Sequence, residues 1–159
     1  MVLYRISEDK YATGLSASGR SARWNKDHQF VLYTADSEAL CTLECVAHRA
    51  SILPSKKYKL MFIEIKNIER YTQEITLPRI EEVFNTLKGE KEVWKSIESY
   101  SILQRITNDW YENNTSLVLK VPSALTLNDS NYIINTRHPD INKVEILKTE
   151  DFNFDNRLL

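Results

Sequence analysis

The chain has 159 residues and a net charge of −1, with 42% hydrophobic and 27% charged residues. Its length and composition are those of one globular domain spanning residues 1–159, and its balanced charge disfavours direct nucleic-acid binding. No run approaches the roughly 20 apolar residues of a membrane helix, and the N-terminal segment lacks the apolar core of a signal peptide, so no membrane contact is expected.

Strands and helices are predicted to mix irregularly along the chain. Apolar runs predict the strands, whereas apolar spacings of three and four residues predict the helices. In chain order we expect a strand at Val2–Ile6, a helical turn at Ser7–Tyr11, a polar loop at Leu15–Gln29, a strand at Phe30–Ala35, a helix at Ser37–Ser51, a strand at Tyr58–Ile65, an irregular stretch at Asn67–Leu77, a helix at Pro78–Leu87 ended by Gly89, a longer helix at Glu92–Tyr111, and strands at Ser116–Val121, Tyr132–Ile134 and Lys143–Lys148. Without a βαβ rhythm or a glycine-rich phosphate loop, this pattern favours an α+β fold.

One acidic residue has an unusual place in the helix predicted at Ser37–Ser51. The apolar residues of that helix share one predicted face, which is made of Leu40, Leu43, Ala47 and Ala50. Glu44 falls inside this face, where an unpaired carboxylate would cost several kcal/mol or more. We therefore expect Glu44 to have either hydrogen-bonding partners or a chemical role.

Two cysteines lie one turn apart on the same predicted helix. Cys41 and Cys45 are followed by His48, but the nearby sequence offers no further ligand at a metal-binding spacing. Small buried thiols are the simpler interpretation, and no metal is expected. The absence of a disulfide framework fits a reducing cytoplasm.

Polar and aromatic residues upstream of Glu44 complete a candidate site. Arg23 lies in the long polar loop, and Tyr33 lies on the following strand, which the strand–helix connection would bring close to Glu44. The alternative is structural: Tyr33 belongs to the core and Arg23 pairs with Glu44. Spacing alone does not separate these interpretations.

Residues further along the chain are ambiguous on spacing alone. Ser123 follows a predicted strand end, where both a ligand contact and ordinary turn chemistry are common. Asn131 and Asn135 flank another strand and are typical turn residues, as is His138 before a proline. No Ser-His-Asp or Cys-His arrangement is indicated.

Taken in order, these segments resemble the RES-domain family, the toxin halves of bacterial toxin–antitoxin pairs. The resemblance covers essentially the whole chain and rests on Leu3–Ile6, Leu15–Ser16, Arg23–Asn25, Val31–Ser37, Ala39–Leu40, Leu43–Glu44, Val121–Ser123, Asn131–Asn135, His138–Pro139 and Phe152–Leu158. It implies an ADP-ribosyltransferase-like fold, with a split mixed β-sheet and flanking helices. It also implies an enzyme that consumes NAD+ as a substrate, by hydrolysis or by phosphorolysis with inorganic phosphate.

The resemblance further implies roles for particular residues. The family glutamate, serine and pocket tyrosine match Glu44, Ser123 and Tyr33, and family arginines match Arg23 and Arg5. Glu44 would stabilise the positive charge that develops on the ribose when nicotinamide leaves, and an arginine would clamp the pyrophosphate. The residues expected to be catalytic are Arg23, Tyr33, Glu44 and Ser123, and those expected to bind NAD+ are Arg5, Trp24, Asn25 and Asn135.

One departure from the family pattern concerns the long loop. Many members carry a Gly-Gly pair before the Arg-Trp-Asn motif, whereas Ser21 and Ala22 stand there in this chain. Because this loop is expected to border the pocket, the change bears on the acceptor of ADP-ribose. Alternatives to NAD+ degradation are ADP-ribosylation of a protein target, a non-catalytic binding module and a nuclease. The resemblance implies an antitoxin partner with a helix-turn-helix part, and a homodimer is plausible.

Overall fold

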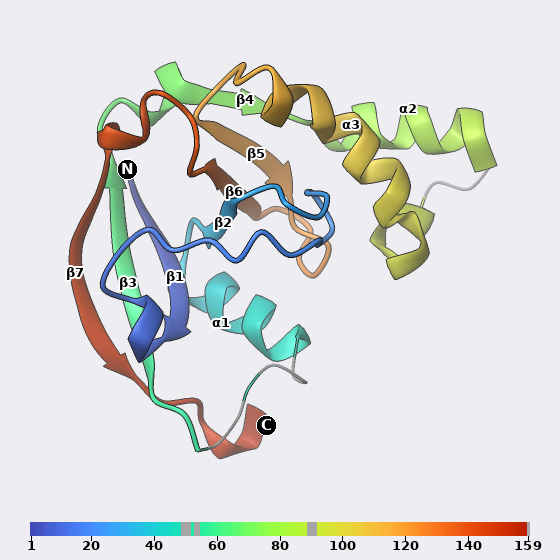
Figure 1. The fold of residues 1–159 in the computed structure, drawn as a ribbon. Helices are drawn as coiled ribbons and strands as arrows, with labels where there is room; N and C mark the ends of the chain where they lie inside the picture. The colour runs from blue at the N-terminus through green and yellow to red at the C-terminus, as the bar shows by residue number, and fades with distance from the viewer. Residues whose placement is uncertain (49–51, 53–54, 89–91, 159) are drawn as a thin grey trace.

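A seven-stranded mixed sheet and three α-helices make up the fold (Figure 1). The computed structural model describes residues 1–48, 52, 55–88 and 92–158. The strands are β1 Val2–Glu8, β2 Val31–Ala35, β3 Tyr58–Ile65, β4 Thr72–Glu74, β5 Val118–Pro122, β6 Ser130–Asn135 and β7 Val144–Phe152; the helices are α1 Glu38–Ala47, α2 Leu77–Lys88 and α3 Tyr100–Glu112. Short 3₁₀ turns connect several of these elements.

The sheet is split between β1 and β2. Its strand order is β4-β5-β6-β2-β1-β3-β7, and all pairs are antiparallel except β4 with β5. β1 and β3 pair along seven positions, whereas β1 and β2 meet only at Tyr4 and Ala35. The sheet therefore consists of two halves, joined at a single point and open beyond it.

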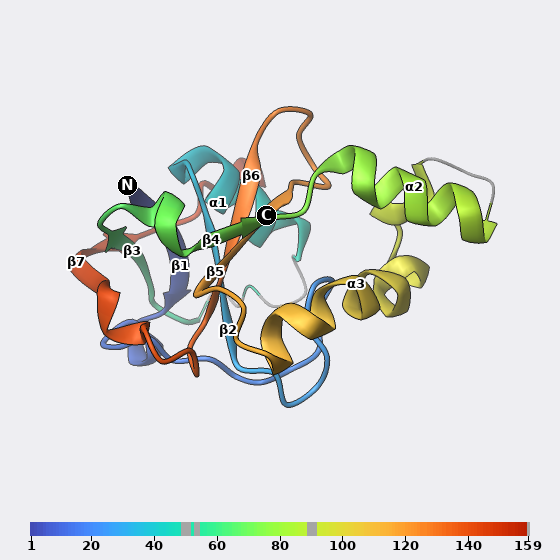
Figure 2. The ribbon, with the colours of Figure 1, turned by 90° about the horizontal axis from the view of Figure 1, so that it is seen from above.

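Helix α1 covers the split between β1 and β2. Helices α2 and α3 cover the half of the sheet that contains β2, β5 and β6. Leu40 and Cys41 of α1 pack against Ile6 of β1, Ala35 of β2 and Leu60 of β3. Helices α2 and α3 lie together at the end of the molecule opposite β7 (Figures 1 and 2). Three separate apolar clusters result: one under α1, one under α2 and α3, and one on the opposite face of the sheet.

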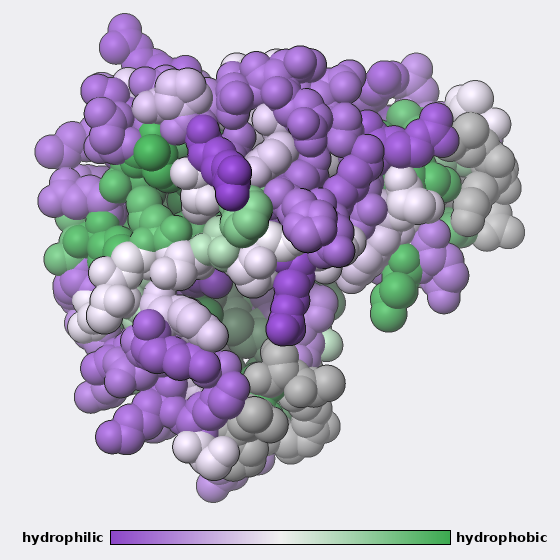
Figure 3. Space-filling view, viewed as in Figure 1, coloured by the Kyte–Doolittle hydropathy of each residue, from purple (hydrophilic) through white to green (hydrophobic). Residues whose placement is uncertain are grey.

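The polar loop predicted at Leu15–Gln29 is present between η1 (Asp9–Tyr11) and β2, and it crosses the front of the sheet in the view of Figure 1. Most of the face seen in Figure 1 carries hydrophilic side chains, and it is hollowed beside α1 (Figure 3). The loop is fixed to α3 because Thr107 donates to the carbonyl of Trp24 at 2.8 Å, and Gln104 donates to the carbonyl of Ala22 at 2.7 Å.

Among the described residues, no helix has the length and apolar character needed to cross a bilayer.

The buried face of α1 differs from the predicted one. The helix begins after Ser37, whose Oγ accepts the backbone N–H of Leu40 at 3.1 Å, and ends at Ala47 rather than at Ser51. Leu40 and Cys41 are buried, whereas Leu43 is 42% exposed. The small thiols therefore take the core positions that were assigned to Leu43 and Ala47, and the latter is also exposed. Ala50 and Ser51 lie outside the described residues.

Two further predictions are wrong in part. The region 92–99 is not the start of α3 but forms two 3₁₀ turns, because Ser96 between them is extended (φ −76°, ψ 162°), and Ile97 is 74% exposed. The stretch predicted to be irregular at Asn67–Leu77 contains β4, which pairs in parallel with β5. Gly89, the expected end of α2, falls outside the described residues. The other strands lie where they were predicted, and their observed bounds differ from the predicted ones by a few residues at most.

Candidate active site

Glu44 is held by two hydrogen-bond donors from the sheet. Its Oε1 accepts the Nδ2–H of Asn131 at 2.6 Å and the hydroxyl of Ser123 at 3.1 Å. The three residues come from α1, from the end of β5 and from the start of β6. Among the described residues, Glu44 makes no ion pair, and both of these hydrogen bonds are on the same oxygen. The carboxylate is therefore oriented by neutral groups, without a neutralising cation.

Ser123 forms the turn that was one of its two predicted roles, and its hydroxyl also contacts Glu44. It follows Pro122 at the end of β5, and its hydroxyl accepts the backbone N–H groups of Leu125 at 3.0 Å and Thr126 at 3.3 Å. This arrangement fixes the turn between β5 and β6 and directs the hydroxyl hydrogen at Glu44. Ser123 is 2% exposed. Because its oxygen already accepts two backbone N–H groups, the hydroxyl hydrogen is the group that contacts the carboxylate.

Asn131 is the site residue that sequence reasoning did not select. It lies opposite Ala35 of β2 and Val121 of β5, so its backbone is fixed from both sides. The available signal was the pair of asparagines that flank the predicted strand. Because these two lie on the same face of a strand, only the position of α1 shows which of them meets Glu44.

Arg5 lies at the split in the sheet. Its Nη1 donates to the backbone carbonyl of Tyr33 at 3.0 Å, so the side chain of a β1 residue reaches β2 where the two backbones have separated. Desolvation lowers the pKa of the Arg5 guanidinium, an effect that the nearby thiols of Cys41 and Cys45 oppose. Among the described residues, no carboxylate lies within ion-pair distance of Arg5. Arg5 therefore lies close to the helix that carries Glu44 and, in the part of the chain that the structure describes, has no anionic partner.

Tyr33 anchors the long loop. Its hydroxyl accepts the backbone N–H of Trp24 at 3.0 Å and donates to Oδ1 of Asn25 at 2.9 Å. Burial raises the pKa of Tyr33 well above its ordinary value, and this effect outweighs the opposing hydrogen bond from Trp24. Tyr33 also lies near enough to Glu44 and Arg23 for their charges to act on it. The tyrosine therefore borders the site while its hydroxyl is used by the loop.

Trp24 and Asn25 are structural residues of the same loop. Trp24 is 2% exposed and belongs to the apolar cluster under α2 and α3. Asn25 is 1% exposed, and its Nδ2 donates to the carbonyls of Arg20, Lys26 and Gln29. Neither side chain is free to contact NAD+, so the structure does not bring these two predicted ligands to a binding surface.

Arg23 does not pair with Glu44. Its Nη1 and Nη2 donate to the carbonyls of Trp94 at 2.8 Å and Lys95 at 2.9 Å, and its guanidinium lies 4.9 Å from the centroid of the Tyr100 ring. The structural alternative considered from the sequence, an Arg23–Glu44 pair, is therefore wrong. Arg23 fastens the long loop to η4 (Glu92–Lys95).

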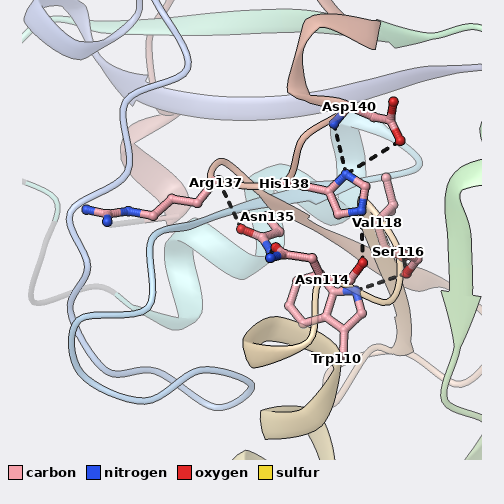
Figure 4. Close-up of polar contacts among 8 residues, drawn as sticks. All are labelled: Trp110, Asn114, Ser116, Val118, Asn135, Arg137, His138 and Asp140. Atoms are coloured by element: carbon pink, nitrogen blue, oxygen red, sulfur yellow. Dashed lines mark hydrogen bonds and ion pairs between the residues drawn. The ribbon is translucent and has the colours of Figure 1, made fainter.

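Asn135 lies at the opposite end of β6 from Asn131, about 13 Å away along the strand at ~3.3 Å per residue. It is fully buried; its Nδ2 donates to Oδ1 of Asn114 at 3.0 Å, and its Oδ1 accepts the N–H of Arg137 at 3.0 Å (Figure 4). His138 in the same cluster accepts the N–H of Asp140 and lies 3.1 Å from the carbonyl of Asn114, as expected for a turn residue (Figure 4). This cluster braces the sheet and is separate from the Glu44 site.

The two cysteines are apolar packing residues with unequal surroundings. A hydrogen bond with Cys45, together with burial, raises the pKa of the Cys41 thiol, whereas that hydrogen bond and the charge of Arg5 lower the pKa of Cys45. Within the described residues, no group of three or more potential ligands is arranged for a metal. Two surface hollows, of about 370 and 530 Å³, are lined by other residues and do not include Glu44.

The comparisons with known proteins agree with this architecture. A family model described as the RES domain matches residues 2–155. The chain belongs to the RES domain family. It is similar to a protein named Toxin Res from Photorhabdus laumondii, with 27% identity over 100% of this chain and 97% of that protein. A second Toxin Res, from Yersinia enterocolitica, is 28% identical over 99% of both chains.

Two further similarities concern activity and fold. A protein from Sphingobium sp. named Prs ADP-ribosylating toxin is 26% identical over 98% of this chain and 91% of that protein. The toxin–antitoxin complex MbcT-MbcA of M. tuberculosis contains a chain that superposes with a TM-score of 0.72, at 18% identity over 96% of this chain and 84% of that one. The α+β fold is thus confirmed, and the chain is a RES-domain protein similar to proteins that are named as toxins.

Proposed function

We propose that this RES-domain toxin cleaves the bond between nicotinamide and ribose in NAD+. The observation that carries the proposal is the carboxylate of Glu44, which Ser123 and Asn131 hold by Oε1, with no cation paired to it among the residues that the structure describes. A fixed anion can stabilise a cationic transition state without reorganising. Its second oxygen, Oε2, is the natural acceptor for a ribose hydroxyl.

The chemistry requires only one carboxylate. Nicotinamide leaves NAD+ as a neutral molecule, so no general acid has to protonate it, in contrast to a glycosidase, which needs two carboxyl groups. Positive charge develops on the ribose as the bond breaks, and the anion of Glu44 stabilises it. Water or inorganic phosphate would then add to the same carbon. NAD+ is here a substrate, and no prosthetic group is required.

The structure favours Arg5 over Arg23 as the pyrophosphate ligand. Arg5 is a desolvated cation that has no carboxylate partner within the described part of the chain, and an anionic ligand would stabilise it. Arg23 already donates to two backbone carbonyls, so it would bind phosphate only by giving up those hydrogen bonds. Its role in the proposal is to hold the loop that closes over the bound dinucleotide.

Purified protein incubated with NAD+ tests this proposal directly. The proposal predicts free nicotinamide, quantified by chromatography, and growth arrest when the chain is produced in cells. The second product identifies the acceptor: ADP-ribose indicates hydrolysis, and ADP-ribose 1″-phosphate, formed only with phosphate, indicates phosphorolysis. Intact NAD+ after prolonged incubation at high enzyme concentration would reject the proposal.

ADP-ribosylation of a protein target is the second candidate. It is favoured by the Sphingobium relative, which carries the name Prs ADP-ribosylating toxin. The same Glu44 chemistry serves both reactions, since only the acceptor differs. NAD+ labelled in its adenylate half would mark a protein band if transfer occurs, whereas rapid nicotinamide release without a labelled band supports degradation.

A toxin of this kind requires a partner that restrains it. The structural neighbour was solved as a toxin–antitoxin complex, which supports an antitoxin for this chain as well. By the family resemblance we propose a partner with a helix-turn-helix part, acting with the toxin in the cytoplasm. Co-production of the product of the adjacent gene should relieve growth arrest and yield a complex that copurifies.

A further inference from the structure

We infer that Asn131 is a positioning residue that sets the orientation of the Glu44 carboxylate. The inference rests on the proposed NAD+ cleavage and names a residue that was not selected for that reaction from the sequence. Asn131 donates Nδ2–H to Oε1 of Glu44 at 2.6 Å, which is shorter than the 3.1 Å contact from Ser123. Hydrogen bonds to an ionised acceptor are the strong ones. The amide therefore makes the tighter of the two contacts that orient the carboxylate.

The backbone of Asn131 is held rigidly by its position in the sheet. It pairs with Ala35 on one side and Val121 on the other, and it is 8% exposed. Glu44, by contrast, lies on α1, which covers the single junction between the two halves of the sheet. A donor on the fixed strand can hold the longer glutamate side chain in one rotamer, which a helix surface alone would not do.

An amide suits this position better than a charged group would. A lysine or arginine would neutralise the carboxylate and weaken its stabilisation of the ribose cation, whereas an aspartate would repel it. The neutral Nδ2–H orients Oε1 and leaves the negative charge available at Oε2. Because this contact acts through Glu44 and does not touch the dinucleotide, its loss should lower kcat and leave KM nearly unchanged.

Asn131→Ala is the first test, and Asn135→Ala is its matched control. Asn135 is the same residue type on the same strand and face and is also buried. Its Nδ2 donates to a side-chain oxygen at 3.0 Å, but in a cluster remote from Glu44 (Figure 4). Both variants should lose thermal stability. Only Asn131→Ala should lower the kcat for nicotinamide release, by about 10- to 100-fold, the worth of one hydrogen bond to a charged group.

Asn131→Asp tests the inference through the pH dependence of activity, which would not change if Asn131 served only the stability of the fold. The introduced carboxyl would face Glu44, and two such groups share a proton whose apparent pKa is raised. In its protonated form, the introduced group can again donate to Oε1. The activity of this variant relative to wild type should therefore rise as the pH falls from 8 to 6. A relative activity that is constant with pH would contradict the inference.

The outcomes are separable from those of the proposed function. If the wild-type protein releases no nicotinamide, the proposed function fails and the inference fails with it. If the wild type is active and Asn131→Ala, verified as folded, retains its kcat within about twofold, only the inference is overturned. Equal losses in the Asn131 and Asn135 variants would also overturn it, since the effect would then be one of stability.

Discussion

Removal of a single hydroxyl group from Tyr33 should uncouple the long loop from the sheet. In Tyr33→Phe, the backbone N–H of Trp24 loses its acceptor and Oδ1 of Asn25 loses its donor. Both partners are almost fully buried, so water cannot easily replace the hydroxyl. Two lost hydrogen bonds and two unsatisfied groups should together lower the free energy of unfolding by about 2–4 kcal/mol.

The difference in unfolding free energy between wild type and Tyr33→Phe should depend on pH in a defined direction. Burial raises the pKa of folded Tyr33 above the unfolded value of about 10, so its contribution to stability is fully present below pH ~10 and is lost as the pH rises further. The difference in unfolding free energy between wild type and Tyr33→Phe should therefore shrink above pH 10, by about 1.4 kcal/mol per pH unit. Urea denaturation at pH 8, 10 and 11 measures both quantities. A difference below about 0.5 kcal/mol at pH 8, or one unchanged at pH 11, would refute the assignment of Tyr33 as the loop anchor.

Three other substitutions test the structure through its stability. Leu40→Ala should lower the free energy of unfolding by about 2–5 kcal/mol, because Leu40 is buried. Leu43→Ala should change it by no more than about 0.5 kcal/mol, because Leu43 is exposed. Urea denaturation that ranks the two variants in the opposite order would contradict the orientation of α1. Arg23→Lys should lower the free energy of unfolding by about 1–2 kcal/mol, because an ammonium cannot reproduce two hydrogen bonds to two carbonyls while lying over the ring of Tyr100. Limited proteolysis should then cut the 13–30 loop faster than in wild type, whereas an unchanged cleavage rate would argue against this fastening role.

Strands could be located from the sequence because their apolar runs coincide with buried positions. Tyr58–Ile65 is the clearest case, since the predicted and observed bounds agree. The strand β4 escaped prediction because its sequence, Thr72–Glu74, is polar and its partner strand β5 is far away in the chain. The face of α1 was misassigned because hydropathy ranks Leu43 above Cys41, although the sheet beneath accepts the smaller thiol.

The candidate site was predictable in part. Glu44 and Ser123, expected to act together, are in direct contact. The choice between Asn131 and Asn135 depended on where α1 crosses the sheet, and no local pattern contains that information. Trp24 and Asn25 match a family motif, but their burial shows that a matching residue can serve the loop instead of the ligand.

The central claim is that the carboxylate of Glu44 breaks the nicotinamide–ribose bond. The most direct measurement is the rate of nicotinamide release from NAD+ by wild type and by Glu44→Gln, with Glu38→Gln as the control. Glu38 is an exposed acid in the first turn of the same helix, so its substitution changes the net charge equally. The account predicts wild-type turnover for Glu38→Gln and a loss of at least about 100-fold for a folded Glu44→Gln. Turnover by Glu44→Gln within a few-fold of wild type would contradict it.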